Sequence, residues 1–173
     1  YADRIETLIS GYTRHNGRRK PELMSPETYS VLHYEEAERV LAELQKLTDD
    51  AEHLYAEIPQ EKRDAFFQLV MHPVLATANI TRLNIAVAKN RLYANQGRNT
   101  AEQYRQQAKE FFQRDQKLKE RYHSINNGKW RHFMDQPHIG YTNWQNPEGD
   151  QMPVVYEYIP GDYAEMGIAL EGI

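Results

Sequence analysis

The chain has 173 residues, the length of one ordinary domain with room for a hydrophobic core. Its 21 lysines and arginines against 25 aspartates and glutamates give a net charge of −4, which argues against non-specific nucleic-acid binding. No apolar run approaches the ~20 residues of a membrane helix, and the absence of cysteine excludes disulfides, thiolate metal sites and thiol catalysis.

The amino-acid composition changes near residue 126. Before this point Ala, Leu, Glu, Gln, Arg and Lys dominate, which is typical of helices, and after it Trp, Tyr, Pro, Gly, Asn and His are enriched. We therefore predict a mainly α fold, an antiparallel bundle of four to five helices over residues 1–128 with an extended, aromatic-rich C-terminal tail. Residues 129–160 are expected to be irregular and packed on the bundle, and residues 161–173 to form an extended linker.

The first two helices are predicted from apolar residues at three- and four-residue spacing. One covers residues 1–12 and is expected to stop at Asn16-Gly17, and the other covers residues 34–58 and ends at Pro59. Because the chain begins with Tyr1 on a pattern that is already helical, we interpret it as a segment of a longer polypeptide.

The third helix is predicted over residues 60–96, with Pro73 expected to kink or break it. Residues 74–87 are apolar almost all round, which indicates the central helix of the bundle. The fourth helix is expected to begin at Asn99 or Thr100, with Glu102 completing a capping box, and to end at residues 127–128.

Asp115 lies in the apolar row of this fourth helix. The other positions of the row are Tyr104, Ala108, Phe111, Leu118, Tyr122 and Ile125. A buried carboxylate costs several kcal/mol unless it is paired, so we predict an Arg, His or Tyr partner from another helix or from the tail. The alternative is that a slightly rotated helix leaves Asp115 exposed.

The tail combines aromatic rings with polar side chains. The aromatic residues are Trp130, Phe133, Tyr141, Trp144, Tyr156 and Tyr158. Rings packed under a loop would explain them, and so would a surface on which flat rings stack against sugars. His132, Asp135 and His138 are residue types that suit zinc, but their spacing matches no familiar ligand pattern, and we predict neither a metal site nor a cofactor.

No catalytic constellation is evident. Glycosidases need two carboxyl groups that face one bond, and the spacing of the tail's carboxylates selects no such pair. The chain has no nucleophile elbow and no glycine-rich phosphate loop. From its residues alone the sequence indicates a helical domain of unstated function.

Several stretches together resemble glycoside hydrolase family 115, the xylan α-glucuronidases. They are Lys20-Pro21-Glu22-Leu23, residues 34–40, 63–70 and 88–94, Asn127-Gly128-Lys129-Trp130, His138-Ile139-Gly140-Tyr141-Thr142, Trp144-Gln145 and Met152-Pro153. The resemblance covers nearly the whole chain, and the stretch 129–153 is its most specific part. The sequence departs from the family pattern at Asn143, and variation at Arg131 and Phe133 further weakens the comparison with the standard sugar-stacking tail.

The resemblance implies a multidomain enzyme in which a barrel precedes a helical bundle and a β-sandwich follows it. This chain resembles the bundle and its exit segment, with the linker 161–173 leading to the sandwich. The family removes glucuronic acid or its 4-O-methyl form from glucuronoxylan by an inverting mechanism, and its catalytic carboxylates belong to the barrel. No catalytic residue is therefore expected here, and the residues expected to shape a substrate cleft or a domain seam are Trp130, His132, Asp135, His138, Tyr141 and Trp144.

The resemblance also sets the expected partners. These are the barrel and β-sandwich of the same polypeptide, xylan bound through that polypeptide, and a second copy of the chain in a homodimer. No nucleic acid and no membrane are expected, and a polysaccharide substrate implies a periplasmic or extracellular location. The chain alone is expected to be inactive. The alternative interpretation is a non-catalytic carbohydrate-binding or protein-interaction module.

Overall fold

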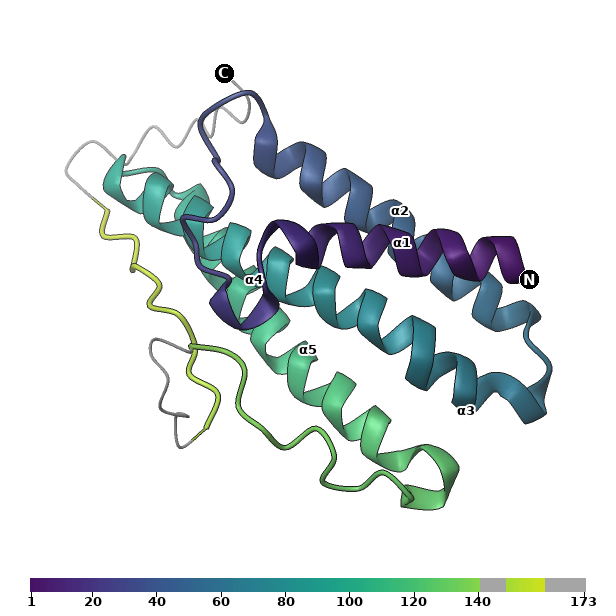
Figure 1. The fold of residues 1–173 in the computed structure, drawn as a ribbon. Coiled ribbons are helices and arrows are strands. Elements are labelled where there is room, and N and C mark those ends of the chain that lie inside the picture. Colours follow the sequence, from purple (N-terminus) through teal and green to yellow (C-terminus); the bar gives the residue numbers. More distant parts are fainter. Residues whose placement is uncertain (141–148, 161–173) are drawn as a thin grey trace.

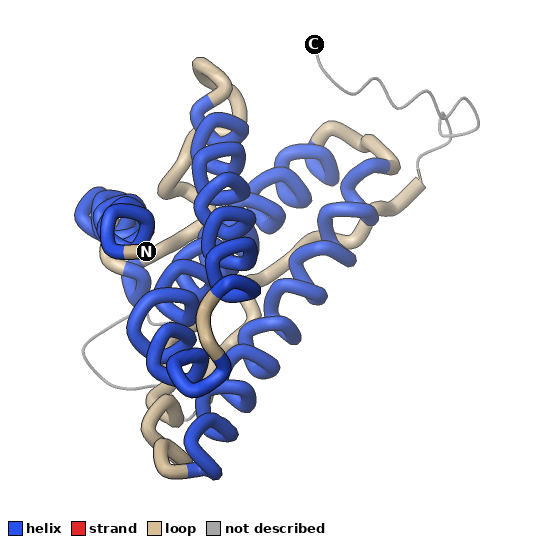
Figure 2. Tube along the Cα trace, turned by 90° about the vertical axis from the view of Figure 1, so that its right-hand side faces the viewer, coloured by secondary structure: helices blue, strands red, loops and turns tan. Residues whose placement is uncertain are grey.

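The computed structural model describes residues 1–140 and 149–160, and it confirms a mainly α fold (Figure 1). The four long helices are α1 (Ala2–Arg18), α2 (Glu36–Glu57), α4 (His72–Asn95) and α5 (Thr100–Gly128). Shorter helical pieces are η1 (Pro21–Leu23), η2 (Gln60–Lys62), α3 (Arg63–Phe66) and the π-turn η3 (Phe67–Met71). Within the described ranges no residue belongs to a β-strand, and Figure 2 shows helices joined by loops.

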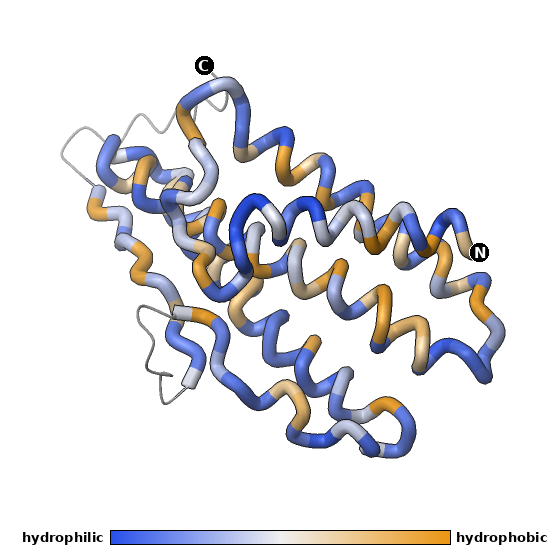
Figure 3. Tube along the Cα trace, in the orientation of Figure 1, coloured by the Kyte–Doolittle hydropathy of each residue, from blue (hydrophilic) through white to orange (hydrophobic). Residues whose placement is uncertain are grey.

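Helix α4 is the centre of the bundle. It contacts α1, α2 and α5, and it runs antiparallel to its neighbours α2 and α5 (Figure 1). Its buried residues lie on all sides of the helix, as the apolar stretch 74–87 predicts. Figure 3 shows the contrast with α5, which is largely hydrophilic along its length. No helix of the described chain combines the length and apolar character needed to cross a bilayer.

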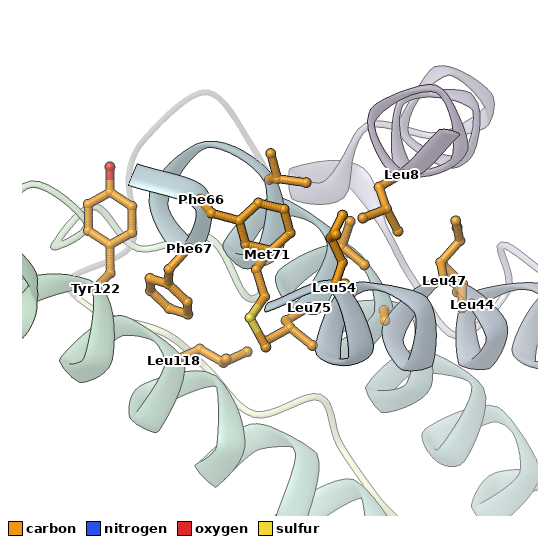
Figure 4. Packing of buried hydrophobic residues seen from close by; sticks show 14 of the residues in the cluster. Leu8, Leu44, Leu47, Leu54, Phe66, Phe67, Met71, Leu75, Leu118 and Tyr122 are labelled. Carbon is orange, nitrogen blue, oxygen red and sulfur yellow. The ribbon is translucent and has the colours of Figure 1, made fainter. Parts of the chain in front are cut away.

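The hydrophobic core joins all of these helices (Figure 4). Leu8 of α1, Leu44 and Leu54 of α2, Phe67 of the π-turn and Leu118 of α5 are buried in one cluster. Fully burying an aliphatic or aromatic side chain of this size stabilises a fold by about 1.5–3 kcal/mol. The packing of apolar side chains from these helices therefore holds the bundle together.

Helix α1 continues beyond the predicted stop signal at Asn16-Gly17 and ends at Arg18, so the predicted boundary is wrong. Contacts with the rest of the bundle explain the extra turn. His15 is buried, and Asn16 Oδ1 accepts a hydrogen bond of 3.2 Å from the Thr77 hydroxyl on α4. These contacts offset the cost of about 1 kcal/mol that a glycine imposes inside a helix.

Helix α2 begins at Glu36, two residues later than predicted, because Tyr34 and Glu35 have left-handed φ angles of 57° and 51°. Tyr34 is 90% exposed and does not join the apolar face. The preceding turn is held by Ser30, whose hydroxyl accepts the backbone N–H of His33 and whose own N–H donates to the Glu36 carboxylate at 2.8 Å. A local hydrogen-bonded turn thus replaces the expected first helical turn.

The predicted break at Pro73 takes the form of the π-turn Phe67–Met71. Proline lacks an N–H and its ring clashes with the carbonyl four residues earlier, and a widened turn relieves both problems. Pro73 stands at the start of α4, where a missing N–H costs little. The chain therefore continues in nearly the same direction through α3, the π-turn and α4.

Helix α4 ends shortly before a glycine, which lets the chain turn into α5. Gly97 has a φ of +67°, and the Arg98 N–H donates to the Tyr93 carbonyl at 2.9 Å, as in a Schellman motif. The predicted capping box of α5 is wrong, because the Asn99 side chain makes no cap hydrogen bond and the Glu102 carboxylate binds Arg105. The helix ends at Gly128, near the predicted boundary, but its backbone already leaves the helical conformation at Ile125, Asn126 and Asn127.

Candidate functional site

The tail returns along α5 toward the junction between α4 and α5 (Figure 1). The main anchor at its far end is Asn90 of α4, which is fully buried. Its side-chain amide donates to the carbonyls of Ala101 and Tyr156, and its carbonyl oxygen accepts the Tyr156 N–H at 2.7 Å. Arg91 donates to the Val154 carbonyl at 2.9 Å. Asn90 and Arg91 both lie in the stretch 88–94 that carries the resemblance, but the sequence alone predicted no role for either residue.

Asp115 is buried, with 4% of its surface exposed, as its place in the apolar row predicts. Its partner is a histidine of the tail, one of the predicted types: His138 Nε2 lies 3.0 Å from Asp115 Oδ2. The contact is an ion pair, and it encloses Asp115 Oδ2 away from solvent.

A second carboxylate faces the other side of the same imidazole. Asp150 Oδ1 accepts the backbone N–H groups of His138 and Ile139 at 2.7 and 2.9 Å, and it lies 3.6 Å from His138 Nδ1. Its Oδ2 accepts a hydrogen bond of 3.2 Å from the Gln116 amide on α5. The tail is thereby joined to α5 through one imidazole between two carboxylates.

The two carboxylates determine the charge of His138. The Asp115 contact, and then the more distant charge of Asp150, outweigh burial and raise the pKa of His138 to about 9. Burial alone would raise the pKa of Asp150, but the backbone N–H groups of His138 and Ile139 and the nearby imidazolium lower it. At neutral pH the cluster is therefore a cation held between two anions.

His72, at the start of α4, has the opposite preference. Burial lowers its pKa to about 4, against the attraction of the nearby Asp115 charge, and the charges of His138 and Arg121 lower it further. Its ring meets the Tyr122 ring edge-on at 4.8 Å between centroids, and its Nδ1 is buried without a hydrogen-bond partner in the described chain. The sequence gave no reason to single out this histidine among seven.

These groups border a cavity of about 720 Å³ between η1, the start of α4, the middle of α5 and the tail. Its lining combines charged, polar and apolar side chains. They are Lys20, Glu22, Leu23, His72, Ala76, Asp115, Leu118, Lys119, Phe133, Met134, Gln136, Pro137 and His138. This volume lies within the range of small-molecule sites in proteins.

His132 and Asp135 form a separate pair on the surface. His132 Nδ1 lies 2.7 Å from Asp135 Oδ2, and His123 Nε2 of α5 lies 3.6 Å from the other carboxylate oxygen. The hydrogen bond with His132 lowers the pKa of Asp135. The His132 side chain is 73% exposed, and neither member of the pair lines the cavity. The structure thus separates His138 from the other two polar candidates of the tail.

Trp130 belongs to a row of packed rings. Its ring meets Phe133 edge-on at 5.6 Å, and Phe133 stacks on Tyr122 of α5 at 6.1 Å. Trp130 packs against the main hydrophobic cluster, whereas Phe133 is largely exposed and borders the cavity. This arrangement indicates that Trp130 serves to pack the tail on the bundle. One face of the Phe133 ring remains exposed and could contact a ligand.

Two of the predicted site residues, Tyr141 and Trp144, lie outside the described residues, as does the expected linker 161–173. Within the described ranges, Asp115, His138 and Asp150 are the group whose donor atoms, all within 4.8 Å of one another, could hold a metal ion. The sequence predicted no metal site. In this arrangement each ring nitrogen of His138 already faces a carboxylate, which suits an imidazolium better than a metal-bound imidazole.

Comparison with known proteins adds no relative from which a function could be transferred. No protein-family model matches the chain, and a search among curated proteins finds no significant match.

Proposed function

We propose that the chain is the accessory helical domain of a glycoside hydrolase of the family 115 type. The enzyme would release glucuronic acid or 4-O-methylglucuronic acid from glucuronoxylan by an inverting mechanism. Its general acid and general base would lie in a barrel outside this chain, so the chain alone is expected to be inactive.

The observation that carries this proposal is where the resembling residues lie. Asn90 and Arg91, from the stretch 88–94, hold the tail at one end, and His138, Ile139 and Gly140, from the most specific stretch, join it to α5 and to Asp150. Some of the residues that resemble the family thus attach the tail to the bundle, which supports a role in shaping a seam or the wall of a cleft.

The carboxylates near the cavity support a non-catalytic role. An inverting glycosidase holds its two carboxyl groups roughly 6.5–9.5 Å apart with a water between them. Asp115 and Asp150 instead have oxygens within 4.8 Å of each other and share His138. Neither is available to act as an acid or a base without losing its ion pair.

The surface offers places where other domains or a second copy of the chain could pack. Leu32 and Tyr34 are exposed in the loop before α2, and Val154 and Ile159 are exposed along the tail. Exposed apolar side chains of this size in neighbouring positions are typical of contact surfaces. The barrel and β-sandwich of the same polypeptide are the proposed occupants, and the periplasmic or extracellular location follows from the proposed substrate.

The alternative function is a carbohydrate-binding module that works without the other domains. The cavity of about 720 Å³ favours it, because its lining lies wholly within this chain. The two proposals differ in where uronic acid is released and in whether the chain needs a barrel.

The test is an assay of uronic acid released from glucuronoxylan by the complete polypeptide and by this chain alone. We expect release by the complete polypeptide and none by the chain. A complete polypeptide that releases no uronic acid would rule out the proposed enzyme, and release by the chain alone would rule out the accessory role.

Two matched variants of the complete polypeptide test whether the tail only packs between domains or also contacts the substrate. His138→Gln removes the imidazolium between the two carboxylates, and His53→Gln changes an exposed histidine of α2, away from the tail. If the tail only supports the fold, His138→Gln lowers the folded fraction and leaves kcat/KM per folded molecule unchanged. If the tail contacts substrate, His138→Gln lowers kcat/KM per folded molecule, and His53→Gln remains like the unmodified protein.

A further inference from the structure

The tail segment from Val154 to Ile159 is bonded to the bundle along one side of its backbone. The Val154 carbonyl accepts a hydrogen bond from Arg91. The N–H and the carbonyl of Tyr156 both pair with the Asn90 side chain. In an extended chain the backbone N–H and C=O groups of alternate residues point to the same side, so these groups all face α4.

The opposite side of this segment is an open backbone edge. It carries the N–H and C=O groups of Val155, Glu157 and Ile159, and none of these backbone groups has a hydrogen bond to another described residue. Figure 1 shows the segment, in yellow, at the margin of the fold with the helices on one side of it. A row of backbone groups that no partner takes up is a template for an added strand.

The residues around the open edge suit one added strand. Pro153 and Pro160 flank the segment and have no N–H to donate, which keeps the edge short. Val154 and Ile159 expose 66% and 80% of their surfaces. Both are β-branched, and such side chains are enriched in sheets because they pack well against a neighbouring strand.

The charges beside the open edge indicate which strand it would accept. Arg105 forms ion pairs of 2.9 Å with both Glu102 and Glu157, so two carboxylates share one guanidinium and leave a net charge of −1. The Glu157 side chain is 72% exposed. A lysine or arginine directly opposite Glu157 would balance this charge, whereas a second copy of the segment in full antiparallel overlap would set Glu157 opposite itself.

We propose that residues 154–159 form a docking edge for an extended polypeptide segment that carries a lysine or arginine between two apolar residues at alternate positions. Its backbone bonds to Val155, Glu157 and Ile159, as in other cases of strand addition. Its basic side chain pairs with Glu157, and its apolar side chains lie beside the two flanking residues. The proposal rests on the contacts of the tail and not on the proposed enzyme.

The experiment adds the peptide Thr-Val-Thr-Lys-Thr-Val-Thr, with both ends blocked, to this chain and follows amide hydrogen exchange by NMR. The peptide has the same pattern in both strand directions. Without peptide, exchange should be slow at Tyr156 and fast at Val155, Glu157 and Ile159. A peptide concentration about ten times the dissociation constant should slow these three amides about tenfold and leave Tyr156 unchanged.

Two changed peptides test the backbone and the charge separately. N-methylation of both valines and the lysine removes the N–H groups that face the open edge, so this peptide should give no protection. Replacing the lysine by glutamate keeps the N–H groups and sets a like charge opposite Glu157, so this peptide should bind more weakly.

Two glutamate variants of the chain provide the matched control. Glu157→Gln removes the charge beside the open edge, and Glu61→Gln removes the same charge from an exposed position of η2. Glu157→Gln should weaken binding of the lysine peptide about two- to fivefold, and Glu61→Gln should not change it. Slow exchange at Tyr156 in both variants shows that the tail is still docked.

Four results would overturn the proposal. They are the absence of protection with the lysine peptide, equal binding of the N-methylated peptide, equal affinities of the two glutamate variants, and protection of the same amides by dimerisation without peptide, which would assign the open edge to a second copy of the chain. Release of uronic acid by the complete polypeptide is measured separately. Failure of the peptide to bind would therefore reject the docking edge and leave the proposed enzyme to its own assay.

Discussion

At the scale of single residues, two histidines near the same carboxylate differ in charge, since one is a cation and the other is neutral. His138 lies between Asp115 and Asp150 and stays protonated, while His72 is surrounded by rings and stays neutral. The difference follows from the balance of burial and charge, because burial disfavours an imidazolium and a carboxylate favours it. The free energy of unfolding must therefore depend on pH through both groups.

We predict a stability maximum near pH 6.5. The raised pKa of His138 stabilises the fold below pH 6.5, and this contribution disappears as the pH rises toward 9. The lowered pKa of His72 stabilises the fold above pH 6.5, and that contribution disappears as the pH falls toward 4. The melting temperature, measured between pH 4 and pH 9, should fall on both sides of pH 6.5.

Variants show which histidine causes the loss of stability on each side of pH 6.5. His138→Gln should flatten the decline above pH 6.5, and His72→Phe should reduce the decline below it. His53→Gln, at an exposed site of α2, should leave the profile unchanged. If the profile of His138→Gln runs parallel to that of the unmodified chain between pH 6.5 and 9, the imidazolium does not stabilise the fold.

Gly140 offers a second prediction at this scale. Its φ is +77°, and an added Cβ would lie 2.8 Å from both the Cβ and the carbonyl oxygen of Gln151. Gly140→Ala should therefore destabilise this part of the tail by about 1–3 kcal/mol, as seen in urea denaturation or in faster exchange of the Gln151 amide. The control is Gly17→Ala inside α1, where nothing lies within 4 Å and we expect a gain of about 0.5–1 kcal/mol.

At the scale of elements, the tail is held by side chains from α4 and α5 rather than by a strand partner. The Asn90 amide replaces the backbone of a neighbouring strand, since it both donates to and accepts from Tyr156. Ile139 is the one buried residue of the described tail, and Trp130, Met134, Met152 and Val155 are only partly buried against the core. The tail is therefore expected to be the least stable described part of the chain.

Asn90→Ala tests this arrangement. It removes both bonds to Tyr156 and the bond to the Ala101 carbonyl, so we expect a loss of about 1–3 kcal/mol in the local stability of the tail. Hydrogen exchange should accelerate at the Tyr156 amide and remain slow in α2 and α4. Asn95→Ala, at an exposed position of the same helix, should change neither. Unchanged exchange at Tyr156 would show that other contacts hold the tail.

At the scale of the whole molecule, exposed apolar side chains predict self-association. Leu32 and Tyr34 are both exposed in the loop before α2, and their exposure should favour a concentration-dependent dimer of the isolated chain. Sedimentation velocity should show the shift, and replacing both residues by serine should reduce it without changing the helical content. A clean monomer at high concentration would contradict this prediction.

The sequence predicted the bundle well because apolar periodicity is a local signal. It placed α2, α4 and the row on α5 that buries Asp115. It failed at Gly17, where the bonds of Asn16 and the burial of His15 outweigh a local stop signal. It could not find Asn90, His72 or the cavity, because their roles depend on which residues from distant segments meet.

The attachment of the tail to Asn90 has a consequence for the order of folding. The bond between Asn90 and Tyr156 joins residues 66 positions apart, and the site on α4 exists only after α5 has packed beside it. Contacts of such high sequence separation form late, so we expect the tail to dock last on a finished bundle. Since the tail supplies one wall of the cavity, any molecule bound there would slow undocking and add to the stability of the final folding step.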